Sequence, residues 1–162
     1  MSFEIRSESF DQILPVWKEQ LWPGRRSAIE PISMIDSRGR IDMSIEGLSR
    51  LHPPLFFSAR GAEGEVIGVV GTQRTGLRER RLRGLWVAPS SRGAGVGRKL
   101  VESVFSVAKD DGDTLVWTMA REVSVPFYSQ CGFKTGPKIE AYEFGPHHLM
   151  TKSVRQTFAQ FF

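Results

Sequence analysis

The chain has 162 residues, of which 40% are hydrophobic and 25% charged, and its net charge at pH 7 is +4. This length suffices for one domain that buries an apolar core without help from metal ions or disulfides. The single cysteine excludes an internal disulfide and favours a reducing compartment. No apolar run approaches the roughly 18 residues that span a bilayer, and the N-terminus lacks the apolar region of a signal peptide. We therefore expect one cytoplasmic domain over residues 1–162 that does not bind membranes.

The first part of the chain predicts a strand, a helix, a long loop and a second helix. Residues 3–6 predict the strand, and Ser9 or Asp11 can cap the helix that follows. The apolar side chains on one face of this helix are Ile13, Leu14, Trp17 and Leu21. Residues 22–42 are rich in helix-breaking residues and predict a loop with short helical pieces, and a long loop inside a compact domain is often functional. Residues 43–51 predict the second helix.

The remainder of the chain predicts strands that alternate with helices. Residues 55–75 contain two strand-like stretches joined by a Gly-Ala-Glu-Gly turn, and residues 80–87 predict a third strand. A helix begins at Val96, because apolar residues repeat from there at every fourth position. The later elements are a strand over 114–119, a short helix that contains Phe127 and Tyr128 and stops at Gly132, and two strands within 133–152. The order β-α-α-β-β-β-α-β-α-β-β predicts a mixed α/β sheet.

Three glycines stand where the long helix begins, in the segment LRGLWVAPSSRGAGVGRKL, which covers residues 82–100. The first N–H groups of a helix have no partner within it, and residues without Cβ atoms let a diphosphate lie directly on them. We therefore expect Gly93, Gly95 and Gly97 to form an anion site. The spacing is not the GxGxxG of dinucleotide-binding proteins. It is not the GxxxxGK[ST] of P-loop proteins either, because an arginine follows the last glycine.

The pattern that fits is Arg-x-x-Gly-x-Gly, at Arg92, Gly95 and Gly97. Here the chain resembles the GCN5-related N-acetyltransferase (GNAT) superfamily, whose pyrophosphate loop reads [QR]-x-x-G-x-[GA] after its fourth strand. The predicted order of elements is also that of the superfamily, so the resemblance covers residues 3–152, with the motifs in residues 55–152. It implies the acyl-CoA N-acyltransferase fold, a mixed, mostly antiparallel central sheet with flanking helices.

The resemblance implies a binding site for acetyl-CoA as co-substrate. In the family, the strand before the loop separates from its neighbour and pairs with the pantetheine arm, which implies this role for Leu85, Trp86 and Val87. The loop that would hold the pyrophosphate, mainly through backbone N–H groups, consists of Arg92, Gly93, Ala94, Gly95, Val96, Gly97 and Arg98. The two arginines of this loop add positive charge.

A second family pattern places a tyrosine in a short helix before a Gly-Phe pair, and PFYSQCGF matches it. Ser124 can cap this helix, and Pro126 is tolerated in its first turn. When an amine displaces the acetyl group, coenzyme A leaves as a thiolate, and a phenol with a pKa of about 10 can protonate it. The resemblance therefore implies that Tyr128 is the catalytic acid.

No residue stands out as the general base. The candidates are Glu46, His52, Glu79 and Glu122, and the amine can also lose its proton to water. The adjacent histidines His147 and His148 lack the further ligands that a metal site requires, so we expect no metal. We place them at a strand edge or in a substrate pocket.

Five arginines lie between positions 74 and 83. They form either a solvated hairpin face or a site for an acidic acceptor, since arginine binds carboxylates and phosphates through two N–H groups. The segment from Trp22 to Arg26 combines an aromatic ring with two guanidinium groups. This segment is either a packed loop or part of a pocket for a small polar amine.

The sequence thus predicts an N-acetyltransferase that moves an acetyl group from acetyl-CoA directly to an amine, in a ternary complex and without a metal. A small-molecule acceptor is favoured. A non-catalytic acyl-CoA-binding module, or acetylation of a protein N-terminus or lysine, remains open, as do longer acyl donors and a homodimer. A nucleic-acid-binding protein is suggested only by the positive charge, because no helix clusters basic residues and aromatic and basic residues do not interleave.

Overall fold

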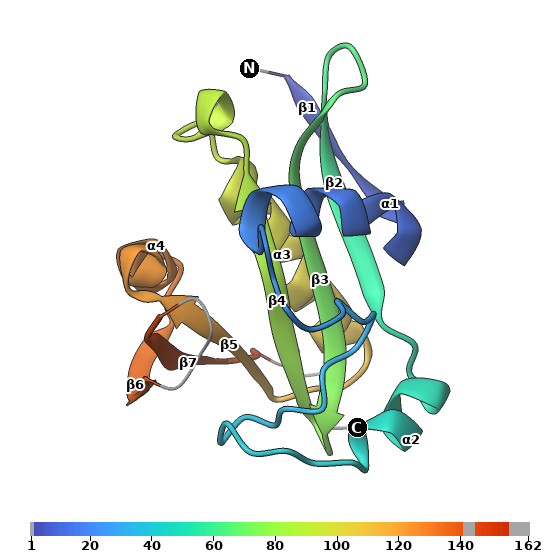
Figure 1. Ribbon diagram of the computed structural model, residues 1–162, viewed down its shortest axis with the longest axis vertical. Helices are drawn as coiled ribbons and strands as arrows, with labels where there is room; N and C mark the ends of the chain where they lie inside the picture. Colours follow the sequence, from blue (N-terminus) through green and yellow to red (C-terminus); the bar gives the residue numbers. More distant parts are fainter. Residues whose placement is uncertain (1, 141–144, 156–162) are drawn as a thin grey trace.

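The computed structural model describes residues 2–140 and 145–155, which build a seven-stranded sheet covered by helices on both faces (Figure 1). The strands are β1 (Phe3–Glu8), β2 (Leu55–Gly61), β3 (Val66–Gly76), β4 (Glu79–Val87), β5 (Leu115–Arg121), β6 (Lys134–Ile139) and β7 (His147–Ser153). The helices are α1 (Phe10–Val16), α2 (Ile45–Leu51), α3 (Val96–Asp110) and α4 (Val125–Gln130). The strand order is β1-β2-β3-β4-β5-β7-β6, and each pair is antiparallel except β4–β5. The predicted order of elements and the mixed, mostly antiparallel sheet are confirmed.

Helix α1 begins at a capping box. The Ser9 hydroxyl accepts from the Gln12 N–H (3.3 Å) and the Gln12 side chain accepts from the Ser9 N–H (2.8 Å), so Ser9 and not Asp11 is the cap. Pro15 lies inside the helix, and the chain continues as one π-helical turn over Trp17–Leu21. Trp17 is fully buried at the start of this turn.

The long loop over residues 22–42 crosses the same sheet face as α1 (Figure 1). It contains turns and a bridge between Ile35 and Ile41, and the short helical pieces expected there were wrong. The reason is that its backbone bonds to the sheet. The Ser33 N–H donates to the Gln73 side chain (2.7 Å), and the Gln73 amide donates back to the Ser33 carbonyl (2.8 Å).

Apolar side chains form a core on each face of the sheet. Behind it, α3 buries the face that carries Val96, Leu100, Val104 and Ala108, as its four-residue repeat predicted. In front, Trp17 packs with Ile13, Phe56 and Val69. No helix in the described part of the chain is long and apolar enough to cross a membrane.

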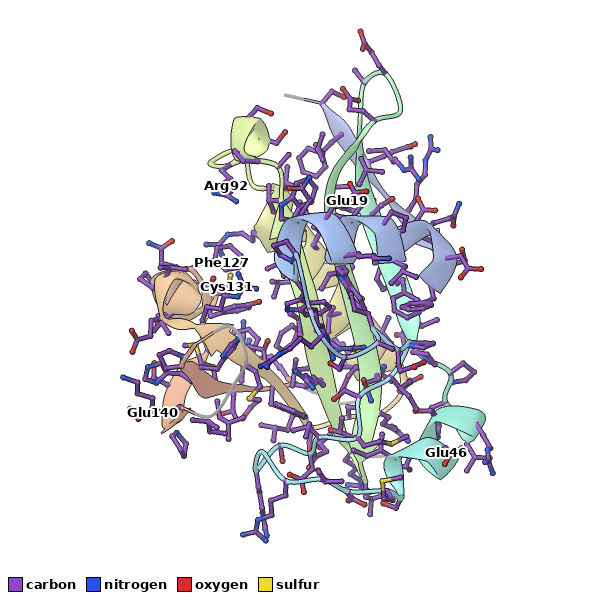
Figure 2. All side chains as sticks on the ribbon, in the orientation of Figure 1. Glu19, Glu46, Arg92, Phe127, Cys131 and Glu140 are labelled. Atoms are coloured by element: carbon purple, nitrogen blue, oxygen red, sulfur yellow. The ribbon has the colours of Figure 1, made fainter. Side chains whose placement is uncertain are left out.

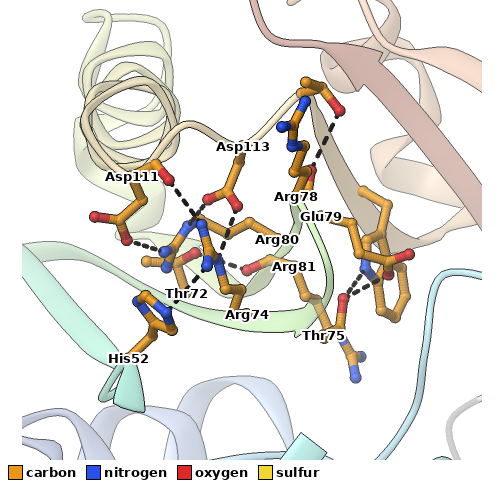
Figure 3. A network of polar contacts seen from close by, with 12 residues as sticks. His52, Thr72, Arg74, Thr75, Arg78, Glu79, Arg80, Arg81, Asp111 and Asp113 are labelled. Carbon is orange, nitrogen blue, oxygen red and sulfur yellow. Dashed lines mark hydrogen bonds and ion pairs between the residues drawn. The ribbon is translucent and has the colours of Figure 1, made fainter. Parts of the chain in front are cut away.

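Two of the hairpin arginines are buried in an ion-pair network where β4 meets β5 (Figure 3). The fully buried Asp113 accepts from Arg74 Nε (3.0 Å) and from Arg80 Nε (2.8 Å). Arg80 also bonds Asp111 (2.5 Å), and Arg74 Nη1 lies 3.0 Å from His52 Nε2. A buried charge requires a partner, and the loop after α3 supplies it.

The alternation of β4 separates these arginines from the others. Arg80 points to the face that packs on α3, whereas Arg81 and Arg83 point to the front face. The expectation of a solvated arginine face was wrong for Arg74, Arg80 and Arg83, which are 8%, 1% and 6% exposed.

Candidate active site

Strands β4 and β5 pair over three residues and then separate (Figure 1). The last paired residues are Arg81 and Trp117. One position further, the Thr118 hydroxyl donates to the Leu82 carbonyl (2.9 Å), so a side chain takes the place of the next backbone contact. The end of β4 that carries Leu85–Val87 therefore has no strand on this side among the described residues.

A bulge at Gly84 shapes this end of β4. The register with β3 shifts between the pair Val69–Trp86 and the pair Gly71–Arg83, and Gly84 has a φ of 68°. The Trp17 indole donates to the Gly84 carbonyl (2.8 Å). The bulge is thus held from the front face by the π-helical turn.

The backbone of Val87 faces the open side of β4. The Ala88 N–H donates to Ile67 of β3 (2.8 Å), and backbone groups of successive residues in an antiparallel strand point to opposite sides. The Val87 carbonyl accepts from Arg92 Nε (3.1 Å). Leu85, Trp86 and Val87 are all half-buried. The Val87 backbone can therefore meet an arm that carries amide groups, whereas that of Trp86 faces Val69 of β3.

The glycine-rich loop that follows leaves space in front of the first turn of α3. Gly93 and Gly95 have φ values of 82° and 85°, and a Cβ atom at either position would meet no heavy atom within 4 Å. The first backbone bond of α3 runs from Lys99 to Gly95 (3.1 Å), so the N–H groups before Lys99 have no partner within the helix. Arg92 and Arg98 are exposed beside them. The arrangement fits a pyrophosphate.

Three members of the loop contribute in other ways. Val96 is 1% exposed, so only its backbone can meet a ligand, and Ala94 is exposed. A Cβ atom at Gly97 would lie 3.0 Å from the Phe127 ring. Gly97 therefore lets α4 approach the start of α3, a packing role that the sequence pattern did not reveal. Figure 2 shows Phe127 on α4 and Arg92 near the end of β4.

Tyr128 lies at the point where β4 and β5 separate. Its ring packs against Phe127 and Phe133, each 5.3 Å away between centroids, and its side chain hydrogen-bonds Thr118. Burial raises the pKa of Tyr128 far above 10, although Thr118 and the charge of Arg81 oppose this. The phenol is therefore protonated at neutral pH, which is the form that an acid requires.

The start of α4 differs in part from the prediction. Pro126 lies in its first turn as expected, but the Ser124 side chain makes no capping bond. The residues Glu122–Ser124 form a 3-10 turn, so the chain is already helical at Ser124 and the side chain does not reach the capping position.

The four candidate bases are all engaged elsewhere. Glu46 is exposed and pairs with Arg50 (3.1 Å), and it lies at the opposite end of the molecule from Arg92 in Figure 2. His52 belongs to the ion-pair network (Figure 3). The two remaining carboxylates are Glu79, which accepts from Ser37 (3.0 Å) and Thr75 (2.7 Å), and Glu122, which pairs with Lys138 (2.9 Å).

His147 is a half-buried titratable side chain outside the four candidates. It lies opposite Arg121 in the β5–β7 pair, on the front face. Its Nδ1 is 2.9 Å from the Gly145 carbonyl, so Nδ1 donates and Nε2 carries the lone pair. Burial lowers the pKa of His147, as do the charges of Arg121 and Arg81, whereas the Gly145 contact raises it. The sequence did not reveal this environment, because the two arginines come from other strands.

The long loop packs over the arginines of the front face. Arg81 lies over the Trp117 ring (4.9 Å) and donates to the Ser33 hydroxyl (3.0 Å). Trp22 packs edge-on against Trp17 (5.2 Å) and lies under Arg25 (5.2 Å). The aromatic end of the loop is thus packed, and Trp22 covers the front face of β4 at Arg83.

A cavity of about 710 Å³ lies apart from this region, between α3 and the end of β7. Of the predicted site residues only Arg98 lines it. The predicted binding residues instead gather along β4, the glycine-rich loop and α4.

Comparisons with known proteins agree with this geometry. The profile of the acetyltransferase (GNAT) family matches residues 15–133. The fold is similar to that of Ard1 from Thermoplasma volcanium, with a TM-score of 0.69 at 20% identity over 96% of this chain and 99% of that chain. An aminoglycoside 6'-N-acetyltransferase complexed with coenzyme A gives 0.67 at 17% identity, over 94% and 97% of the two chains. Nourseothricin acetyltransferase gives 0.67 at 16% identity, over 96% and 100%.

The family match covers most of the chain, and it includes the separated strand, the glycine-rich loop and Tyr128. The structural likenesses extend over almost the whole chain and support the same fold. The chain therefore belongs to the GNAT family and is an N-acetyltransferase that uses acetyl-CoA as its acetyl donor.

Proposed function

We propose that this enzyme acetylates the amine of a small molecule by direct transfer in a ternary complex. The observation that carries the proposal is the separation of β4 and β5, with the glycine-rich loop at its open end and the Tyr128 hydroxyl at its closed end. A donor that is held at both places would present its thioester between the two strands.

The chain's own backbone would hold the donor. The N–H groups of residues 93–98 suit the pyrophosphate, because they have no partner within α3 and no Cβ atom shields them at Gly93 and Gly95. The Val87 backbone suits an amide of the pantetheine arm, since it faces away from β3. Acetyl-CoA supplies the acetyl group as a thioester.

Two side chains would move the protons. As the amine nitrogen forms the new C–N bond at the acetyl carbonyl carbon, it becomes positively charged and gives a proton to His147 Nε2. Tyr128 gives its phenolic proton to the sulfur as the C–S bond breaks, so that coenzyme A leaves as a thiol. The hydrogen bond with Thr118 lowers the pKa of Tyr128 and so opposes the effect of burial.

A small acceptor is favoured by the long loop. The loop is bonded to β3 through Gln73 and to β4 through Arg81, so it covers the face from which an amine reaches the strand gap. Two structural neighbours are named for small-molecule acceptors, an aminoglycoside and nourseothricin.

The test is a screen of small amines and lysine-containing peptides with acetyl-CoA, in which the release of free thiol is followed. We expect acceptor-dependent release with small amines. Release with peptides or protein N-termini alone would contradict the small-molecule proposal.

A further inference from the structure

We propose that the acceptor amine also carries an oxyanion, a carboxylate or a phosphate, and that Arg83 binds this group. The inference rests on the function proposed above, because it assigns the acceptor to the front face of β4. It goes further by naming a chemical class of acceptor and the residue that selects it.

The burial of Arg83 without an acidic partner is the first argument. Arg83 is 6% exposed, yet across residues 2–140 and 145–155 no carboxylate forms an ion pair with it. The other deeply buried arginines, Arg74 and Arg80, share the carboxylate of Asp113. A buried charge is unfavourable unless it is paired. The lack of such an ion pair at Arg83 among the described residues therefore indicates that a bound ligand supplies the negative charge.

The contacts of Arg83 leave part of its guanidinium group for a ligand. The group lies over the rings of Trp17 (5.0 Å) and Trp22 (5.5 Å), which hold its plane in place. Nη1 donates to the Glu30 carbonyl (2.7 Å). The Nε and Nη2 groups form the edge that binds two oxygens of a carboxylate or phosphate side-on, and neither atom is among the fully enclosed polar atoms without a partner.

The electrostatic surroundings favour an anion at this place. Burial lowers the pKa of Arg83, and the positive charges of Arg81 and Arg25 lower it further, whereas Glu30 raises it. An incoming oxyanion would offset the repulsion from Arg81 and Arg25 and give the buried guanidinium group an oppositely charged partner. The site has the charge and the fixed, planar donor group that oxyanion recognition uses.

The position of Arg83 also sets the size of the acceptor. Arg83 follows Arg81 by two residues on the same face of β4, a distance of about 7 Å along a strand. Arg81 is the last residue of β4 that pairs with β5, so it lies where the gap between the two strands begins. An amine and an oxyanion separated by four or five bonds, as in an ω-amino acid or an amino-alkyl phosphate, come close to spanning this distance.

The competing explanation is that Arg83 only anchors the long loop through Glu30. The loop has a second anchor without charge, since Gln73 makes two hydrogen bonds with Ser33. Gln73→Leu therefore loosens the same loop and leaves the guanidinium group in place, and it serves as the matched control for Arg83→Gln.

The experiment compares matched pairs of acceptors that differ in the oxyanion: ω-amino acids such as γ-aminobutyrate against their carboxamides, and phosphoethanolamine against ethanolamine. Transfer is measured as kcat/KM, and binding to the enzyme–coenzyme A complex is measured by calorimetry. We expect at least one anionic member to bind and react tenfold better than its neutral partner. Arg83→Gln should abolish that preference, Arg83→Lys should weaken it, and Gln73→Leu should affect both members alike.

Equal binding of both members in every pair, or an equal loss for both in Arg83→Gln, would overturn the inference. Efficient transfer to neutral amines alone would overturn it and leave the proposed function intact. Conversely, Arg83-dependent binding of an anionic amine without any transfer would support the oxyanion site and contradict the proposed function.

Discussion

The indole of Trp17 lies directly on the backbone of Gly84, donating to its carbonyl at 2.8 Å, and a Cβ atom on Gly84 would lie 2.3 Å from the ring. The contact joins residues 67 positions apart in the sequence. It connects the π-helical turn on the front face to the bulge that shapes the end of β4. The geometry of the proposed donor site thus depends on a contact made on the front face of the sheet, where the acceptor is proposed to bind.

Gly84→Ala should unfold the enzyme more easily and also weaken coenzyme A binding. The new methyl group clashes with Trp17, and the φ of 68° is unfavourable for alanine. Strain of this kind costs about 1–3 kcal/mol, and the clash adds to it. Urea denaturation measures the stability and calorimetry the affinity. Gly64→Ala is the control, because Gly64 has a φ of 82° and open space around it. A cost no larger than that of the control would contradict the role of the Trp17 contact.

Gly95→Ala should weaken coenzyme A binding by tenfold or more, about 1.4 kcal/mol. The methyl group would occupy the space in front of α3, where the pyrophosphate is proposed to lie. Gly112→Ala, at the other end of α3, has the same positive φ and equally open surroundings. Both variants should lose similar stability, and only Gly95→Ala should lose affinity. Unchanged affinity in folded Gly95→Ala would remove the basis for the pyrophosphate site.

The features that the sequence predicted well are local. The glycine spacing, the four-residue repeat after Val96 and the turn between β2 and β3 each depend on neighbouring residues, and all three appear in the structure. The donor site was therefore predicted from a loop that is contiguous in the chain. Tyr128 was predicted in the same way, from the short pattern around it, and its catalytic role stays a prediction.

The features that were missed depend on residues far apart in the sequence. Asp113 lies 39 positions after Arg74 and 33 after Arg80, so nothing beside the hairpin arginines revealed that they are neutralised. The helical pieces expected in the long loop do not form because Gln73, 40 positions away, takes the Ser33 backbone bonds. The pKa of His147 is lowered in part by Arg121 and Arg81, which belong to two other strands.

Asp113→Asn should destabilise the fold by about 3–5 kcal/mol, the cost of removing one partner of a buried ion pair. Two buried guanidinium groups would lose the Asp113 carboxylate, and only Arg80 would keep another one, that of Asp111. Urea denaturation checks this loss. Glu46→Gln breaks an exposed pair with Arg50 and should cost at most about 0.5 kcal/mol. Similar values for the two variants would show that the network is not a major source of stability.

His147 should make both stability and activity sensitive to mildly acidic pH. Its pKa is lowered in the folded state by burial, Arg121 and Arg81, so the unfolded chain binds the proton more readily. The stabilisation is therefore complete above the unfolded pKa of about 6.5 and is lost as the pH falls through the folded pKa. His147→Gln should flatten the dependence of the unfolding free energy on pH in this window. It should also lower kcat/KM by tenfold or more at pH 7, and an unchanged kcat/KM would exclude His147 as the base.

Tyr128→Phe tests the acid. The ring packing against Phe127 and Phe133 is retained, and only the hydroxyl that hydrogen-bonds Thr118 is lost. General acid catalysis contributes about a hundredfold to ten-thousandfold, so kcat should fall at least tenfold even if water partly replaces the phenol. Coenzyme A affinity should change little, because the proposed binding groups lie in the glycine-rich loop and β4. The unfolding free energy should fall by no more than about 1 kcal/mol, the value of one hydrogen bond. Single-turnover measurements separate the chemical step from product release, and a variant with the wild-type single-turnover rate would rule out Tyr128 as the proton donor.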